Sequence, residues 1–291
     1  MKKAVILTLL TLLLLALRLH GRAEEALLFF NAVPTETFPA ETVLPEMAAA
    51  PAPVTPAPPD GFTLEVVSPS QTAAQGGFRV LIYHTHTYEA YTPTEEMAYT
   101  PTEKWRTANE QRNMVAVGTY LTELLQGAGI DAVHDTTAFE PPRLSTAYER
   151  SLEMLVRRQE NGEVYDLYID LHRDAYSKNN GPNTVEKDGV TMARLLMLIG
   201  KGTGQTGAGY ALKPDWESNR AIAQALSNRL NLQCDGLCRG VALKSGRYNQ
   251  HMSNCCVLIE AGNNYNTLEE ALAAMPFLAN AICALADGQI E

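Results

Sequence analysis

Between residues 78 and 286, short apolar runs typical of buried strands alternate with longer segments that have helical spacing. This alternation predicts an α/β fold with a single sheet and helices on both of its faces, in which functional groups gather at the carboxyl ends of strands. We expect strands at 78–83, 130–134, 165–171, 192–199 and 256–260. We expect helices at 107–125, 144–159, 215–230 and 267–286, the last beginning with a capping box of Thr267 and Glu270.

Residues 1–30 have the pattern of an export signal or membrane anchor. Lys2 and Lys3 precede an unbroken apolar run at residues 4–17, which is typical of a secretory signal and short for a span of roughly 20 residues. Cleaved signal and retained anchor both stay open; the weak cleavage site Gly21-Arg22-Ala23 favours the anchor. Either interpretation places the following residues outside the cytoplasm, and a retained anchor would hold them at the cell membrane.

Residues 31–76 are predicted to be a linker, because the stretch 47–60 consists mostly of Ala and Pro. Such a sequence has few large apolar side chains to bury and tends toward extended conformations. The linker would hold a catalytic domain of residues 77–291 away from the membrane.

The charge and the cysteine spacing argue against a nucleic-acid binder and against a structural cysteine zinc site. The formal net charge of -10 is unsuited to a general nucleic-acid binder, which needs a basic face to neutralise phosphates. The sequence also lacks the paired CxxC motifs of a structural cysteine zinc site.

Three predicted strands end in residues that bind metals or transfer protons. These ends are His84-Thr85-His86-Thr87-Tyr88-Glu89, Asp170-Leu171-His172-Arg173-Asp174 and Glu260-Ala261-Gly262-Asn263-Asn264. Catalytic zinc commonly takes three His or carboxylate ligands and leaves one position for water, while a separate carboxylate serves as base and acid. We therefore predict His86, Glu89 and His172 as zinc ligands and Glu260 as the catalytic carboxylate.

Several alternatives stay open at this point. His84 points to the same side of an extended chain as His86 and is an alternative ligand. Glu110, before the next predicted helix, is an alternative to Glu89, although a helix-dipole partner is its simpler interpretation. Asp170 or Asp174 is a candidate to accept the free N–H of a ligand histidine and orient its ring.

The polar and aromatic segment Lys244–Ser253 precedes the last strand and is a candidate substrate loop. Arg247, Asn249 and His251 in this segment, together with Arg239, are candidates to bind substrate carboxylates or to stabilise an oxyanion. His251 is the best single candidate among them.

The segments VLIYHTHTYEAYTP, VYDLYIDLHRDA, SGRYNQHMSNCCVLIEAGNN and TLEEA closely resemble the stage II sporulation protein P family. The resemblance covers residues 78–286. It implies a zinc amidase-like (phosphorylase/hydrolase-like) fold and cleavage of the N-acetylmuramoyl-L-alanine bond of peptidoglycan, with a further endopeptidase activity on peptide cross-links. It also implies action at the septal and engulfing membranes of a developing spore, with a lytic transglycosylase and a multispanning membrane protein as partners.

Carried over residue by residue, the resemblance supports His86, Glu89 and His172 as ligands of Zn²⁺ and Glu260 as the catalytic carboxylate, and it keeps Glu110 as an alternative. Three positions depart from the family pattern. Tyr88 stands where Ser is usual, Gly246 interrupts the substrate-loop motif, and Ala261 replaces a larger apolar residue. These departures put the shape of the substrate loop in question more than the ligand set.

The expected mechanism is zinc-assisted amide hydrolysis, with Glu260 as base and then acid, and His251 or Arg247 assisting the charge on the tetrahedral intermediate. A zinc carboxypeptidase-like enzyme acting on stem peptides and a non-catalytic peptidoglycan-binding scaffold are the alternatives.

Overall fold

The structure is a computed structural model of the chain and describes residues 77–175, 182–205 and 208–289. The predicted signal or anchor at residues 1–30 and the linker at residues 31–76 lie outside the described residues.

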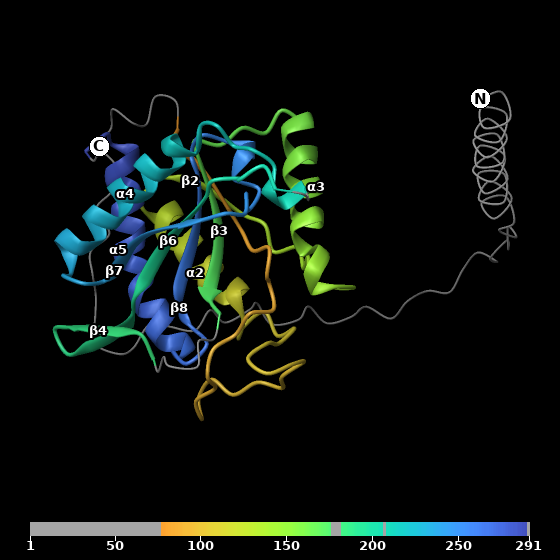
Figure 1. Cartoon of the computed structure of the whole chain (residues 1–291). Coiled ribbons are helices and arrows are strands. Elements are labelled where there is room, and N and C mark those ends of the chain that lie inside the picture. Colours follow the sequence, from red (N-terminus) through yellow and green to blue (C-terminus); the bar gives the residue numbers. More distant parts are fainter. Residues whose placement is uncertain (1–76, 176–181, 206–207, 290–291) are drawn as a thin grey trace, which may run out of the picture. The chain divides into compact units, whose positions relative to one another are not determined.

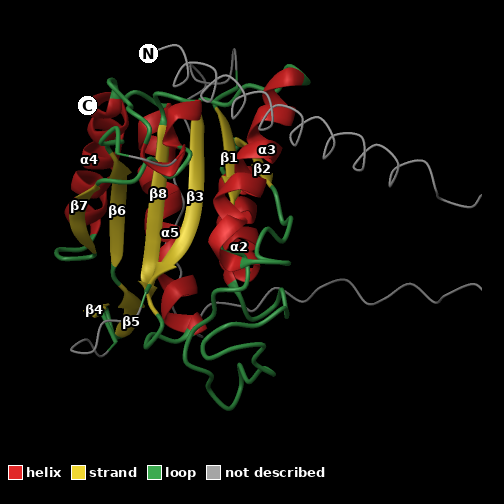
Figure 2. Cartoon of the chain, turned by 45° about the vertical axis from the view of Figure 1, so that its right-hand side comes forward, coloured by secondary structure: helices red, strands yellow, loops and turns green. Residues whose placement is uncertain are grey.

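The described residues build a six-stranded sheet in the order β2-β1-β3-β8-β6-β7 (Figures 1 and 2). Strands β2, β1, β3 and β8 are parallel to their neighbours in that order, whereas β6 is antiparallel to β8, and β7 is parallel to β6. The strands are β1 (Arg79–Tyr83), β2 (Asp131–His134), β3 (Leu167–Asp174), β6 (Leu195–Gly200), β7 (Cys238–Lys244) and β8 (Cys256–Asn263). A separate hairpin joins β4 (Thr184–Lys187) and β5 (Val190–Ala193).

Helices cover both faces of the sheet, which confirms the predicted α/β class. One core contains Val80 and Ile82 of β1 together with buried side chains of α2 (Met114–Gly127), α4 (Trp216–Gln233) and α5 (Leu268–Ala286). The other core contains Leu81 and Tyr83, which alternate with them along β1, and α3 (Ala147–Glu160). The described residues also include three short 3₁₀ helices: η2 (Leu144–Thr146), η3 (Ala208–Tyr210) and η4 (Gln250–Met252).

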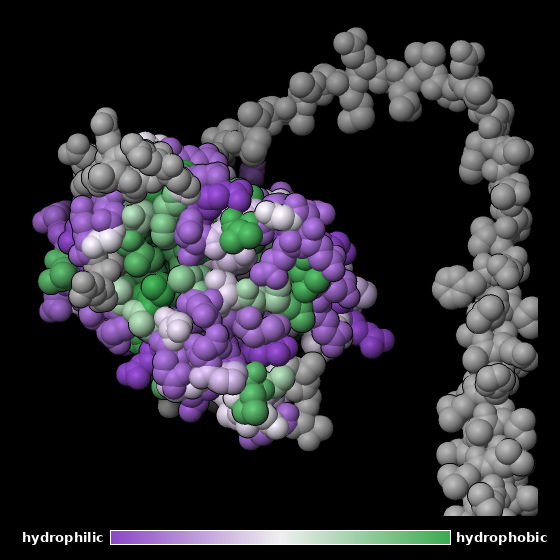
Figure 3. All heavy atoms as spheres, turned by 90° about the horizontal axis from the view of Figure 1, so that it is seen from above, coloured by the Kyte–Doolittle hydropathy of each residue, from purple (hydrophilic) through white to green (hydrophobic). Residues whose placement is uncertain are grey.

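Helix α5 is apolar because it lies in the core. Its length and hydropathy would suit a membrane span, but 83% of that stretch is buried inside the protein. Thr267 and Glu270 form the predicted capping box, which satisfies two free N–H groups at the start of the helix. The face seen in Figure 3 is mostly hydrophilic, with separate apolar patches.

Several predicted boundaries are wrong for identifiable reasons. The helix expected from residue 107 begins at Met114, because Asn113 adopts an extended conformation and its side chain accepts a hydrogen bond from the N–H of Val115. The strand expected at 192–199 is divided at Arg194 into β5 and β6. β7 was not predicted, because its sequence CRGVALK is mostly half-exposed and has no clear apolar alternation.

Strands β3 and β8 continue past the predicted ends at residues 171 and 260. Asp170, His172 and Glu260 all lie within these two strands, so the pleat of the sheet fixes the directions of their side chains.

Candidate active site

His172 and Glu260 are paired in register on the neighbouring parallel strands β3 and β8. Side chains two apart on a strand share a face, so Asp170, His172 and Tyr168 point the same way. Tyr168 packs in the core that contains α3. The chemical groups of β3 and β8 therefore lie on the α3 face of the sheet.

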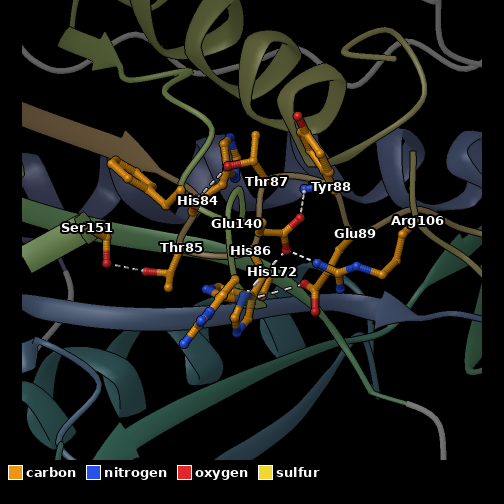
Figure 4. A network of polar contacts seen from close by, with 12 residues as sticks. His84, Thr85, His86, Thr87, Tyr88, Glu89, Arg106, Glu140, Ser151 and His172 are labelled. Carbon is orange, nitrogen blue, oxygen red and sulfur yellow. Dashed lines mark hydrogen bonds and ion pairs between the residues drawn. The ribbon is translucent and has the colours of Figure 1, made fainter. Parts of the chain in front are cut away.

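The loop after β1 brings two further predicted ligands to His172 (Figure 4). The N–H of Glu89 donates to the carbonyl of His86 at 3.1 Å, which turns the chain back on itself. The ring centroids of His86 and His172 are 5.3 Å apart, edge to face. An oxygen of Glu89 lies 3.4 Å from Nδ1 of His172. The structure thus brings together the three residues predicted as ligands from two distant segments.

Each of the two histidines also faces a second carboxylate. Nε2 of His172 lies 2.7 Å from Oδ1 of buried Asp170, which also accepts hydrogen bonds from the N–H and hydroxyl of Thr85. Nδ1 of His86 lies 3.4 Å from Glu140, without the alignment of a hydrogen bond. Glu140 is held by Arg106 and by the N–H of Tyr88 (Figure 4). Carboxylates in such positions fix the ring orientation of histidines that bind a metal through the other nitrogen.

The donor set fits zinc, although no group of three His, Cys, Asp or Glu side chains among the described residues is arranged to hold a metal ion as it stands. With Nε2 of His172 directed at Asp170, Nδ1 of the same ring and the carboxylate of Glu89 face each other at 3.4 Å. Two atoms that each lie about 2.0–2.2 Å from a tetrahedral zinc ion are separated by roughly that distance. His86 adds a second imidazole next to the pair. Two imidazoles and one carboxylate are a ligand set that catalytic zinc accepts.

The two glutamates of the site have opposite electrostatic environments. Burial opposes ionisation of Glu89, but the charge of Arg173, together with His172 and His86, lowers its pKa to about 2. Burial raises the pKa of Glu260 to about 8, and the charges of Glu89 and Asp174 contribute to the rise. Oε2 of Glu260 is buried and has no hydrogen-bond partner among the described residues. Glu89 is therefore suited to bind a cation, and Glu260 to exchange a proton.

The two alternative ligands lie in other environments. His84 is fully buried, with Nδ1 2.7 Å from the carbonyl of Leu171 and Nε2 2.8 Å from Nε2 of His134. Glu110 is exposed on the turn before α2. The described contacts of the His86, Glu89 and His172 cluster involve neither residue.

The predicted substrate residues lie in separate places. Arg247 lines a cavity together with Tyr148 of α3. His251 lies in η4, and burial, together with the charges of Arg247 and Lys213, lowers its pKa to about 4. None of the described contacts joins His251 to the ligand cluster. Arg239 forms an ion pair with Asp174 at 2.8 Å.

Sequence reasoning missed Glu140 and Tyr148. Glu140 follows β2, and the rule that functional groups gather at the carboxyl ends of parallel strands would have found it. Tyr148 has no motif, yet its ring lies 5.5 Å from that of His86 and is stacked 6.5 Å from that of His172.

Comparisons with known proteins agree on the family. The family model described as stage II sporulation protein P (SpoIIP) matches residues 45–283. A stage II sporulation protein P of Bacillus subtilis (strain 168) is 26% identical over 202 residues, which cover 66% of this chain and 47% of that protein. The chain therefore spans about half the length of the curated relative it matches.

Solved structures with similar folds include several amidase domains. The CwlD amidase from Clostridioides difficile, in complex with the GerS lipoprotein, has a TM-score of 0.45 at 12% identity, covering 71% of this chain and 96% of that chain. The catalytic domain of CwlV, an N-acetylmuramoyl-L-alanine amidase from Bacillus (Paenibacillus) polymyxa, has a TM-score of 0.44 at 10% identity, covering 72% and 98%.

Proposed function

Because the chain belongs to the stage II sporulation protein P family, we propose that it is a zinc-dependent hydrolase of the bacterial cell wall. Its reaction would be cleavage of the amide bond between N-acetylmuramic acid and L-alanine in peptidoglycan. One observation carries the proposal: two histidines and a carboxylate, His86, Glu89 and His172, converge beside Glu260, whose pKa is raised to about 8.

His86, Glu89 and His172 would hold the metal, and Asp170 and Glu140 would fix the two imidazole rings. When bound, zinc would polarise the amide carbonyl and acidify a water molecule. A bound cation beside Glu260 would also lower the pKa of this carboxyl and favour its ionised form.

Glu260 would take a proton from the attacking water while the water oxygen joins the carbonyl carbon. The same carboxyl would then return the proton to the amide nitrogen as the C–N bond breaks, releasing the stem peptide as a free amine. Arg247 or His251 would contact the substrate.

The setting of the reaction is part of the same proposal. The apolar N-terminal run would attach the protein to the outer side of the cell membrane, at the septal and engulfing membranes of a developing spore. A lytic transglycosylase and a multispanning membrane protein are the proposed partners.

The test of this function is the variant Glu260→Gln, incubated with purified peptidoglycan. We expect release of stem peptides to be abolished while one zinc per chain, measured by atomic absorption, is retained. Glu217→Gln, an exposed change on α4, is the matched control and should keep full activity. Retained release in Glu260→Gln would refute the role of Glu260.

Mass spectrometry of the digested sacculi separates the alternatives. An amidase leaves intact glycan and free stem peptides, whereas a carboxypeptidase leaves the peptides attached and shortens them. A chain that binds peptidoglycan but contains no zinc and releases nothing would be a scaffold.

A further inference from the structure

The first turns of α3 and the loop of residues 246–249 enclose a cavity of about 400 Å³ beside the predicted active site. Its lining includes Tyr148, Leu152, Tyr210, Arg247, Tyr248 and Asn249. Tyr148 borders both the cavity and the predicted active site. Its ring contacts those of His86 and His172, and it also lies 5.6 Å from the ring of Tyr248. A molecule in the cavity would therefore be next to the predicted zinc ligands.

The loop that forms one wall is held in a defined conformation. Tyr248 and Asn249 both have left-handed backbone angles, with φ of 50° and 55°. Residues other than Gly adopt this conformation only rarely. The side chain of Asn249 compensates by donating to the carbonyl of Tyr148 at 2.8 Å and to the hydroxyl of Ser151 at 3.0 Å. The cavity is thus preorganised against α3.

At Gly246 the ring of Tyr248 lies close to the backbone of this loop. A Cβ atom at Gly246 would lie 3.0 Å from the ring of Tyr248, and a Cβ atom at Gly200 would lie 2.4 Å from the carbonyl oxygen of Gly246. The departure from the family pattern at Gly246 therefore brings the ring of Tyr248 close to the backbone at the cavity wall.

Arg247 is the cationic group of the cavity. Among the described residues, its buried Nε has no hydrogen-bond partner, and no carboxylate forms an ion pair with it. Glu149, the acidic residue that lines the cavity, is exposed to solvent. A guanidinium group stays charged in proteins, and a poorly solvated one is stabilised by an anion that accepts its N–H groups.

We propose that this cavity binds the stem peptide of the substrate, and that Arg247 holds a free carboxylate of that peptide. The inference rests on the proposed function and adds a substrate subsite to it. The glycan offers no anion here, because the lactyl carboxyl of muramic acid is consumed in the scissile amide, whereas stem peptides carry free carboxylates. The rings of Tyr148, Tyr210 and Tyr248 provide apolar area for the rest of the peptide.

The test measures binding separately from cleavage, in the full chain carrying Glu260→Gln. Two probes are compared by calorimetry: an N-acetylmuramoyl tetrapeptide with free carboxylates, and the same compound with every carboxylate amidated. We expect Arg247→Gln to weaken binding of the free acid about 10- to 100-fold, as loss of a charged hydrogen bond implies, and to leave the amidated compound within about twofold. Arg247→Lys, which keeps the charge but lacks the planar fork, should bind the free acid with intermediate affinity.

Arg220→Gln, an exposed change on α4, is the matched control and should bind the free acid normally. Equal weakening of both probes by Arg247→Gln, or none of either, would overturn the inference. So would tight binding of a peptide-free N-acetylglucosamine oligomer in competition with the free acid. Binding of the free acid that depends on Arg247, in a chain whose parent form cleaves no amide, would retain the subsite and refute the proposed function instead.

Discussion

Asp170 and His172 lie two residues apart on one strand, and the carboxylate of the first is 2.7 Å from Nε2 of the second. An ionised Asp170 accepts the proton of Nε2 and leaves Nδ1 of His172 free on the side of Glu89. An amide at position 170 would instead donate from its NH₂ group and favour the tautomer that carries its proton on Nδ1.

For this reason, we expect Asp170→Asn to weaken zinc binding about 10- to 100-fold, the usual cost of losing a carboxylate that orients a ligand histidine. Competition with a chromophoric chelator measures the affinity. Asp235→Asn, at an exposed turn, is the control and should bind zinc normally. Unchanged zinc affinity in Asp170→Asn would show that this carboxylate does not set the tautomer.

The choice between Glu89 and Glu110 can be tested by one matched pair of variants. Glu89→Gln should lose more zinc affinity than Asp170→Asn, because it replaces the carboxylate proposed as a ligand, which a pKa of about 2 keeps ionised, with a neutral amide. Glu110→Gln should retain normal affinity, since that side chain is exposed. The reverse result in the chelator assay would assign the ligand to Glu110.

Helix α2 approaches β1 and β2 closely at Gly118. A Cβ atom there would lie 2.5 Å from Nε2 of both His84 and His134. We expect Gly118→Ala to lower the free energy of unfolding by about 1–3 kcal/mol, the typical cost of overpacking.

Gly127→Ala on the same helix is the control for Gly118→Ala. A Cβ atom at Gly127 has no neighbour within 4 Å, so this change should be neutral or stabilise the protein by up to about 1 kcal/mol. Urea denaturation monitored by circular dichroism measures both variants. Equal stability of the two would argue against the close approach at Gly118.

The contact between buried His84 and half-buried His134 predicts how stability depends on pH. Burial lowers the pKa of His84 to about 4 and that of His134 to about 3, from an ordinary value of 6.5. Between about pH 6.5 and 4 these two histidines bind more protons in the unfolded chain than in the folded one, so their contribution to the free energy of unfolding falls as the pH falls through this range.

Each histidine contributes a slope of up to about 1.4 kcal/mol per pH unit. Replacing His134 with Gln should remove one of these contributions and flatten the dependence, as measured by urea denaturation at pH 7, 6 and 5. A variant with the parent slope would contradict the assignment. The effect should be absent above pH 7 in both proteins.

The sequence was sufficient to predict the central strands β1, β3 and β8, because most of their residues are buried and therefore form apolar runs such as VLIY in β1. It was not sufficient for β7, whose half-exposed residues give no apolar pattern. The capping box at Thr267 was predictable because both of its bonds lie within one turn.

The difference between local patterns and contacts that form only on folding also explains which residues of the site could be predicted from the sequence. His86, Glu89, His172 and Glu260 were predicted from their places at or near strand ends. Glu140 acts through a contact with a histidine more than fifty residues away, and Tyr148 through a helix face that approaches the sheet only in the folded protein. The position of Glu140 after β2 marks it as a candidate but does not give its contact with His86, and no motif marks Tyr148.

The order of the strands in the sheet has a consequence for synthesis. β8 pairs with β3 and carries Glu260, and it is the last strand before α5. Under the proposed function, a chain that is still being made would lack its catalytic carboxylate until β8 has been added, while the proposed ligands after β1 and on β3 wait beside an incomplete sheet. Hydrolysis would then begin only once β8 has paired with β3.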